Sequence, residues 1–239
     1  MKRFPNELSE LLSPAGLRVL TGRHPISGGL AVAGTQFLTL ARALDAKRAS
    51  EAFALLERRL LPHLQIMETK IPPETLYGMT KNYSETLPKV MRCKTAYLEH
   101  KRERAFAVAH ELNLTTMLQS DSFHALAEAV SGQRLRKRFG QQVLCYGAGD
   151  YQGPHNDHHP EERLAENGYI DLHFSLTAPR SAHQQLVYAK RGHLSETATV
   201  TGLGTMTAYR LPFWHYTTPL QAHVPGAHRW VLLGTFLFA

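Results

Sequence analysis

The sequence predicts an α+β fold in which helices pack on a β-sandwich or barrel. Two observations carry this prediction. Apolar residues recur at helical spacing within residues 1–138, and short alternating segments separated by turn residues follow from residue 139 onward. A run of helices followed by a run of strands is typical of this class. Because no repeat or low-complexity linker divides the chain, we expect a single domain over residues 1–239, with 1–138 as a mainly helical flank that shapes a pocket and 139–239 as the β-rich core.

Three helices are expected in the first part. Their apolar stripes cover residues 45–64, 95–112 and 123–130. The third helix has Ser120 or Asp121 as its N-terminal cap, and Gly132 ends it. Residues 71–88 contain three prolines and a glycine, so this stretch is expected to be irregular.

Five strands are expected in the second part. They cover residues 142–146, 169–176, 185–189, 206–211 and 230–238. In the segment 169–176 the side chains of Ile170, Leu172 and Phe174 share one face. Asp171 and His173 share the other face, because successive strand residues point to opposite sides. This strand is therefore expected to have one apolar face and one polar face.

Charge and length limit the possible partners only loosely. A chain of 239 residues can bury a sizeable core. The formal net charge of +7 would suit an acidic partner, nucleic acid included. The basic residues are interleaved with acidic ones, however, and only residues 134–138 form a run without counter-charge. Such a run is most simply a solvated loop or helix end, so nucleic acid is not the expected partner.

The two cysteines and the N-terminus indicate the compartment. Cys93 and Cys145 lie in apolar surroundings without metal-site spacing, which predicts buried, reduced thiols. The first residues are charged and interrupted by Pro5, unlike a secretory signal. Nowhere does the chain contain the roughly 18 consecutive apolar residues that a membrane helix needs. We therefore expect a soluble, cytoplasmic protein without membrane contact; its oligomeric state is left open.

The most informative residues are His155 and Asp157, followed far downstream by His215. Two imidazoles and one carboxylate on one face of a metal ion are the ligand set of non-haem Fe(II) oxygenases. On a strand, residues two apart point to the same side, so His155 and Asp157 are expected to hold one ion together.

The neighbouring residues extend this motif. The segment from Tyr146 to Asp157 reads Y-x-x-G-x-Y-x-x-x-H-x-D, and His215 begins an H-x-x-x-P sequence that ends at Pro219. Together they resemble the iron-binding elements of the Fe(II)/2-oxoglutarate-dependent dioxygenase superfamily, in particular its prolyl-hydroxylase-like branch. The resemblance covers residues 139–239.

This resemblance implies a double-stranded β-helix, or jelly roll, that uses Fe(II), 2-oxoglutarate and O2. It implies that His155, Asp157 and His215 bind the iron, and that Arg229 binds the far carboxylate of 2-oxoglutarate. Arg229 follows His215 by fourteen residues, which is longer than in many members, and Arg210 is the other candidate. Tyr146 is expected either to hydrogen-bond 2-oxoglutarate or to be an ordinary core tyrosine.

Several further residues are candidates with simpler alternative explanations. Substrate contacts are assigned to Tyr151, Asn156, Trp214 and Arg92. Phe213, beside Trp214, is a second aromatic candidate for the pocket wall. Other histidines compete as ligands, but their spacing fits the motif less well; these are His158, His159, His173, His223 and His228. For His173 a hydrogen-bonded position within the sheet is the simpler expectation.

The resemblance leads to a hydroxylase as the expected function. It would oxidise an unactivated C–H bond of a small molecule, such as a free amino acid or a natural-product intermediate, while 2-oxoglutarate is oxidatively decarboxylated to succinate and CO2. Retention of Asp157 favours hydroxylation over halogenation, because related halogenases carry a small residue there. The alternatives are the same chemistry on a protein side chain or an alkylated nucleic acid, and a non-catalytic jelly roll that binds a metal.

Overall fold

The structure of the chain is a computed structural model that describes residues 1–69, 90–136, 140–157 and 168–239. Its helices are α1 (Pro14–Leu20), α2 (Ala46–Arg59), α4 (Arg104–Glu111), α5 (Leu114–Leu118) and α6 (Asp121–Ser131), with 3-10 turns η1 (Leu8–Leu11), η2 (Gly29–Ala31) and η3 (Leu61–His63). Its strands are β1 (Phe37–Leu40), β2 (Gln65–Thr69), β3 (Met91–Tyr97), β4 (Gly140–Tyr146), β5 (Tyr151–His155), β6 (Tyr169–Thr177), β7 (Ala182–His183), β8 (Gln185–Lys190), β9 (His193–Thr199), β10 (Leu203–Leu211), β11 (His215–Thr217), β12 (Gln221–Ala222) and β13 (Arg229–Leu237). The predicted irregular segment 71–88, together with His158 and His159, lies outside the described residues.

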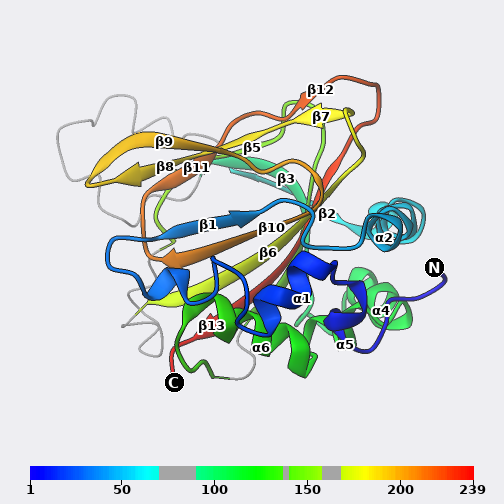
Figure 1. Ribbon diagram of the computed structural model, residues 1–239. Helices are drawn as coiled ribbons and strands as arrows, with labels where there is room; N and C mark the ends of the chain where they lie inside the picture. Colours follow the sequence, from blue (N-terminus) through cyan, green and yellow to red (C-terminus); the bar gives the residue numbers. More distant parts are fainter. Residues whose placement is uncertain (70–89, 137–139, 158–167) are drawn as a thin grey trace, which may run out of the picture.

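Most strands belong to one antiparallel sheet that is nearly closed as a barrel. The strand order is β1-β10-β6-β13-β4-β3-β5-β11-β8-β9, with β2 paired to β3, while β7 and β12 form a separate pair. Figure 1 shows the layer of β5, β8, β9 and β11 facing the layer of β1, β10, β6 and β13. The five predicted strands are all present, as β4, β6, β8, β10 and β13.

Strand β6 separates the helical core from the barrel interior. Ile170, Leu172 and Phe174 are buried in the apolar core shared with the helices. Asp171 and His173 point the other way and line an internal cavity. The predicted alternation is therefore confirmed. Because β13 lies in register between β6 and β4, its residues alternate in the same way.

The helices pack against the outer face of the β10-β6-β13 layer (Figure 1). Two of the predicted helices are present as α2 and α6. At the start of α6, Ser120 Oγ accepts a hydrogen bond from the Phe123 amide, and Gly132 ends the helix with a left-handed φ of 67°. Both features match the caps expected from the sequence.

The predicted helix over residues 95–112 is wrong in its first part. Met91–Tyr97 form strand β3, which pairs with β2, β4 and β5, and helix α4 begins only at Arg104. Local helical spacing is outweighed here because β3 fills the gap between the two layers, where its backbone groups gain partners on both sides. The described part of residues 1–138 thus supplies strands β1, β2 and β3 besides the helices.

Two simpler expectations are also tested by the fold. Cys93 and Cys145 are both buried, as predicted. No helix in the described ranges is both long and apolar enough to cross a membrane.

Candidate metal centre

The two candidate histidines face each other across neighbouring strands. His155 is the last residue of β5, and His215 is the first residue of β11 and its direct partner in the strand register. Their ring centroids are 4.2 Å apart, and the two residues are 7% and 6% exposed. Antiparallel pairing therefore brings together two residues that are sixty positions apart in the sequence.

Asp157 joins these histidines by a turn and not by strand alternation. Strand β5 ends at His155, and Asp157 has a left-handed φ of 55°. The expectation that His155 and Asp157 share one face of a strand is thus wrong in its geometry, although both side chains do converge. The Asp157 Oδ2 atom lies 3.3 Å from His155 Nε2 and 3.5 Å from His215 Nε2.

The three ligand atoms fit one metal ion. All of them lie within 4.8 Å of one another. Ligand atoms held about 2.1 Å from a common ion are separated by about 3 to 3.5 Å at right-angled or tetrahedral geometry. The two distances to Asp157 match this range. Within the described residues no fourth His, Cys, Asp or Glu joins the cluster.

Hydrogen bonds prepare both imidazoles as metal ligands. His155 Nδ1 lies 2.6 Å from the Gly153 carbonyl oxygen, and His215 Nδ1 lies 2.9 Å from that of Phe213. A carbonyl oxygen only accepts, so both Nδ1 atoms must carry the proton, and each Nε2 lone pair faces Asp157. His155 Nε2 is buried and has no hydrogen-bond partner among the described residues. A metal ion would supply the missing partner.

Tyr169 holds the ligand loop from the opposite strand. Its hydroxyl donates a 2.6 Å hydrogen bond to the Asp157 backbone carbonyl. Burial raises the pKa of Tyr169 well above its usual range, with smaller effects of the same sign from Asp171 and Asp157. The hydroxyl therefore remains a donor at every physiological pH.

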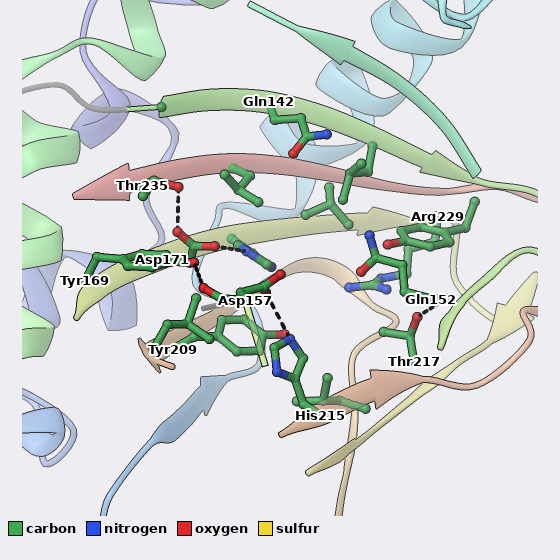
Figure 2. Close-up of a pocket in the computed structure, with 18 of the residues that line it drawn as sticks. Gln142, Gln152, Asp157, Tyr169, Asp171, Tyr209, His215, Thr217, Arg229 and Thr235 are labelled. Atoms are coloured by element: carbon green, nitrogen blue, oxygen red, sulfur yellow. Dashed lines mark hydrogen bonds and ion pairs between the residues drawn. The ribbon is translucent and has the colours of Figure 1, made fainter. Parts of the chain in front are cut away.

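A cavity of about 260 Å³, whose lining includes Asp157 and His215, extends through the barrel interior. Figure 2 shows Arg229 on one side of Asp157 and His215, and Asp171 with Thr235 on the other. The aliphatic part of the wall comes from five residues, Leu144, Leu186, Leu211, Val231 and Leu233. The candidate metal centre thus lies along the wall of an elongated space with a charged group toward each end.

Arg229 is a buried cation on the wall of this cavity. It is 2% exposed, its Nε donates to Ser175 Oγ at 3.1 Å, and its Nη1 donates to Gln184 Oε1 at 2.8 Å. Burial lowers the pKa of Arg229, but an arginine remains charged at neutral pH. No carboxylate of the described residues lies within ion-pair distance of it. Since a buried unpaired charge is costly, this position calls for an anionic ligand.

Tyr146 lies beside this arginine. The Arg229 guanidinium carbon is 5.3 Å from the centroid of the Tyr146 ring, and both residues line the cavity. Burial raises the pKa of Tyr146 well above its usual value, so its hydroxyl stays protonated. Arg210, the other candidate for the anion, instead donates to the Leu30 carbonyl and does not line this cavity.

The residues predicted to contact substrate do not gather at the cavity wall. Arg92 lies 3.0 Å from Asp150 as an ion pair with a largely exposed guanidinium, and it pairs through its backbone with Tyr151. Trp214 is 42% exposed. None of these three, nor Asn156, lines the described cavity, so their roles stay predictions.

Among the rival histidines that the structure describes, only His173 lines the cavity. His228 Nδ1 contacts Glu57 on α2, and His223 Nδ1 lies 3.3 Å from the Arg180 carbonyl. Sequence reasoning missed Tyr169, Tyr209 and Thr235 as cavity residues, and Ser175 and Gln184 as partners of Arg229. The alternation of β6 places Tyr169 and Ser175 on the same face as Asp171 and His173, so these two could have been predicted. Gln184 lies between two short strands, where no sequence pattern indicates its position.

The fold and the three converging ligands define the class: this is a double-stranded β-helix protein with a candidate metal centre inside the barrel. No protein-family model matches the sequence, and no curated protein matches it. Similar solved structures are found, and they share the fold at low sequence identity.

One similar structure is the non-haem α-ketoglutarate-dependent epimerase SnoN from nogalamycin biosynthesis, with a TM-score of 0.54 and 18% identity over 95% of this chain and 84% of that one. A prolyl 4-hydroxylase from Phytophthora capsici has a TM-score of 0.55 and 13% identity over 99% of this chain and 70% of that one. A 2OG-Fe(II) oxygenase family oxidoreductase from Burkholderia pseudomallei has a TM-score of 0.51 and 13% identity over 93% and 89%. At this identity the likeness establishes the double-stranded β-helix fold.

Proposed function

We propose that this protein is an Fe(II)- and 2-oxoglutarate-dependent oxygenase that hydroxylates an unactivated C–H bond of a small molecule, such as a free amino acid or a natural-product intermediate. One observation carries the proposal. Two imidazole lone pairs and a carboxylate converge on one point of a cavity that also contains Arg229, a buried cation without an acidic partner in the described residues. Two of the similar structures named above support the same interpretation, because one is by name a non-haem α-ketoglutarate-dependent epimerase and the other an oxidoreductase of the 2OG-Fe(II) oxygenase family.

Each residue has a defined task in this chemistry. His155, Asp157 and His215 hold iron on one side and leave its other positions open. Arg229 offers a planar, charged fork that matches the far carboxylate of 2-oxoglutarate. Iron, 2-oxoglutarate and O2 supply the oxidising power when bound, with succinate and CO2 as the products of the cosubstrate. The apolar wall beside the ligands excludes water and so protects the reaction from unproductive turnover.

The open ligand set argues against a purely structural metal. Structural zinc sites are closed by four protein ligands, whereas catalytic sites keep a position free. The described residues offer three ligands at this point. An open position inside a cavity is what a reacting cosubstrate requires.

The test is anaerobic titration of the purified protein with Fe(II) and then 2-oxoglutarate. We expect the weak visible absorption of a chelated 2-oxoglutarate complex, and succinate once O2 is admitted. His155→Ala should lose iron affinity. Arg229→Met should keep iron but bind 2-oxoglutarate at least a hundredfold more weakly, since a buried charge-assisted pair is lost.

Arg210→Met is the matched control, because this arginine lies outside the cavity lining, and it should bind both ligands normally. Absence of the absorption band together with absence of succinate would refute the proposal and favour a non-catalytic metal site. Unchanged 2-oxoglutarate affinity in Arg229→Met would refute the assignment of Arg229 alone.

A further inference from the structure

The cavity contains a second polar cluster that the iron chemistry does not use. Strand register places Asp171 of β6 directly opposite Thr235 of β13. The Thr235 hydroxyl donates to Asp171 Oδ1 at 2.6 Å, and Asp171 Oδ2 lies 3.7 Å from His173 Nε2. All three residues line the cavity, and Figure 2 shows the Asp171 carboxylate turned into it.

Two polar groups of this cluster, the Asp171 carboxylate and His173 Nε2, are incompletely paired among the described residues. Asp171 is only 8% exposed, and no Lys or Arg of the described residues lies within ion-pair distance of it. His173 Nε2 is buried and without a hydrogen-bond partner in the described part of the chain. The expectation that His173 is an ordinary hydrogen-bonded sheet histidine is therefore wrong for this atom. A buried carboxylate beside an unsatisfied ring nitrogen is costly unless a ligand completes the network.

The position of the cluster relates it to the proposed reaction. Thr235 lies six positions after Arg229 on β13, which corresponds to about 20 Å along an extended strand. In Figure 2, Asp157 and His215 lie between these two ends of the cavity. A molecule bound at Asp171 would therefore approach the candidate metal centre from the side opposite Arg229.

Charge balance favours a cationic occupant. With a divalent ion and doubly charged 2-oxoglutarate in place, the charges of Asp157, Arg229, ion and cosubstrate cancel. The charge of Asp171 is then left over in a space of low dielectric, where an uncompensated charge is unfavourable. The aromatic ring of Tyr209, 4.5 Å from the His173 ring, adds a surface that suits a cation.

Resting on the proposed function, we infer that Asp171, with Thr235 and His173, forms the subsite for a protonated amine of the substrate. The substrate class is then a small molecule with a cationic nitrogen, which Asp171 binds as an ion pair. Thr235 fixes the orientation of the carboxylate, and His173 Nε2 serves as a second polar contact. Binding of the amine would place the neighbouring carbon atoms beside the metal centre.

The test uses pairs of probes of equal shape that differ in charge, namely piperidine and tetrahydropyran, and cyclohexylamine and cyclohexanol. Their dissociation constants are measured by ligand-observed NMR on protein loaded with Zn(II) and 2-oxoglutarate, which cannot turn over. We expect each amine to bind wild-type protein about tenfold or more tightly than its neutral counterpart, because a hydrogen bond to a charged partner is the stronger kind.

Asp171→Asn should remove this preference while leaving the affinity for the neutral probes unchanged. It retains an oxygen that can accept from Thr235, so the fold should be maintained. Glu196→Gln is the control, because it removes the same charge from β9, outside the cavity lining, and should keep the preference. Equal binding of both probes to wild-type protein, or a preference that survives in Asp171→Asn, would overturn the inference.

The wild-type comparison does not depend on the folding of any variant. It is repeated with the metal-free protein, and 2-oxoglutarate binding is measured separately. If wild-type protein binds neither iron nor 2-oxoglutarate, the proposed function is refuted. If it binds both but shows no preference for the amines, only the amine subsite is refuted.

Discussion

At the scale of the residue, Asp157 has the least favourable backbone conformation of the three candidate metal ligands. A left-handed φ costs a non-glycine residue about 1 to 2 kcal/mol, and aspartate tolerates it better than most because its short side chain is polar. The turn aims Oδ2 at both histidines, and Tyr169 fixes the carbonyl of the same residue. The strain thus lies on the residue that orients the metal ligand set, where such strain is often functional.

Tyr169→Phe is therefore expected to weaken metal binding. It removes the 2.6 Å hydrogen bond to Asp157 but leaves the ring and the three ligands in place. Loss of an outer partner of a metal ligand typically lowers metal affinity by about 10- to 100-fold. The measurement is a competition titration with a metal indicator. The control is Tyr188→Phe on β8, which removes a hydroxyl from the residue whose backbone pairs with His215. Equal affinities in the two variants would show that the turn holds without Tyr169.

At the scale of the element, sequence patterns predict the structure correctly where it depends on interactions within a single strand or helix. The alternation of β6 and the caps of α6 follow from local chemistry, so they are predictable from residues 169–176 and from Ser120 and Gly132. Strand β3 is not, because its pairing with β4 depends on residues nearly fifty positions away. The same holds for Gln184, whose contact with Arg229 joins two distant segments.

Close packing between β13 and α6 depends on Gly234. A Cβ atom added there would lie 2.5 Å from Phe123 Cε1 and 2.9 Å from its Cζ, and Phe123 is fully buried. Gly234→Ala should lower the free energy of unfolding by about 1 to 3 kcal/mol, the usual cost of overpacking. Gly140→Ala on the neighbouring strand is the control, since its Cβ would meet Thr235 at an ordinary 3.5 Å. Urea unfolding of both variants distinguishes them, and an equal loss would argue against the packing explanation.

The contact between α2 and β13 should make stability depend on pH. Burial acts to raise the pKa of Glu57, but hydrogen bonds from His228 and Trp230, with the nearby charges of His228 and Lys94, hold it below the usual 4.5. A carboxyl group whose pKa is lower in the folded than in the unfolded state stabilises the fold at pH values above the unfolded-state pKa. This stabilisation is lost as the pH falls through the folded-state pKa. Glu57→Gln should therefore reduce stability at neutral pH and lessen its decline below pH 4.5. Urea unfolding at several pH values tests this, and parallel curves for wild type and variant would contradict it.

At the scale of the whole molecule, the surface and the interior carry charges of opposite sign. The chain has 27 Lys and Arg against 20 Asp and Glu, yet with the proposed iron and 2-oxoglutarate bound the cavity would keep the negative charge of Asp171. The motif from Tyr146 to Pro219 allows the cofactor class to be predicted. The acidic end of the cavity could not be predicted as a site, because it is built by the register of β6 on β13.

This contrast bears on the alternative of an alkylated nucleic acid as substrate. The described part of the basic run, Arg134 and Arg136, is tied by backbone hydrogen bonds to the last residues of the chain, near the end of β13. A run this short can neutralise few phosphates, and each contributes only about 0.7 to the salt slope of single-stranded binding. The acidic end of the cavity would in addition repel a polyanion. We therefore expect a fluorescently labelled oligonucleotide to bind with a slope of log affinity against log salt no steeper than about −2. A slope near −5 that becomes shallower by about 1.4 when Arg134→Gln and Arg136→Gln are combined would contradict this and make nucleic acid the substrate to pursue.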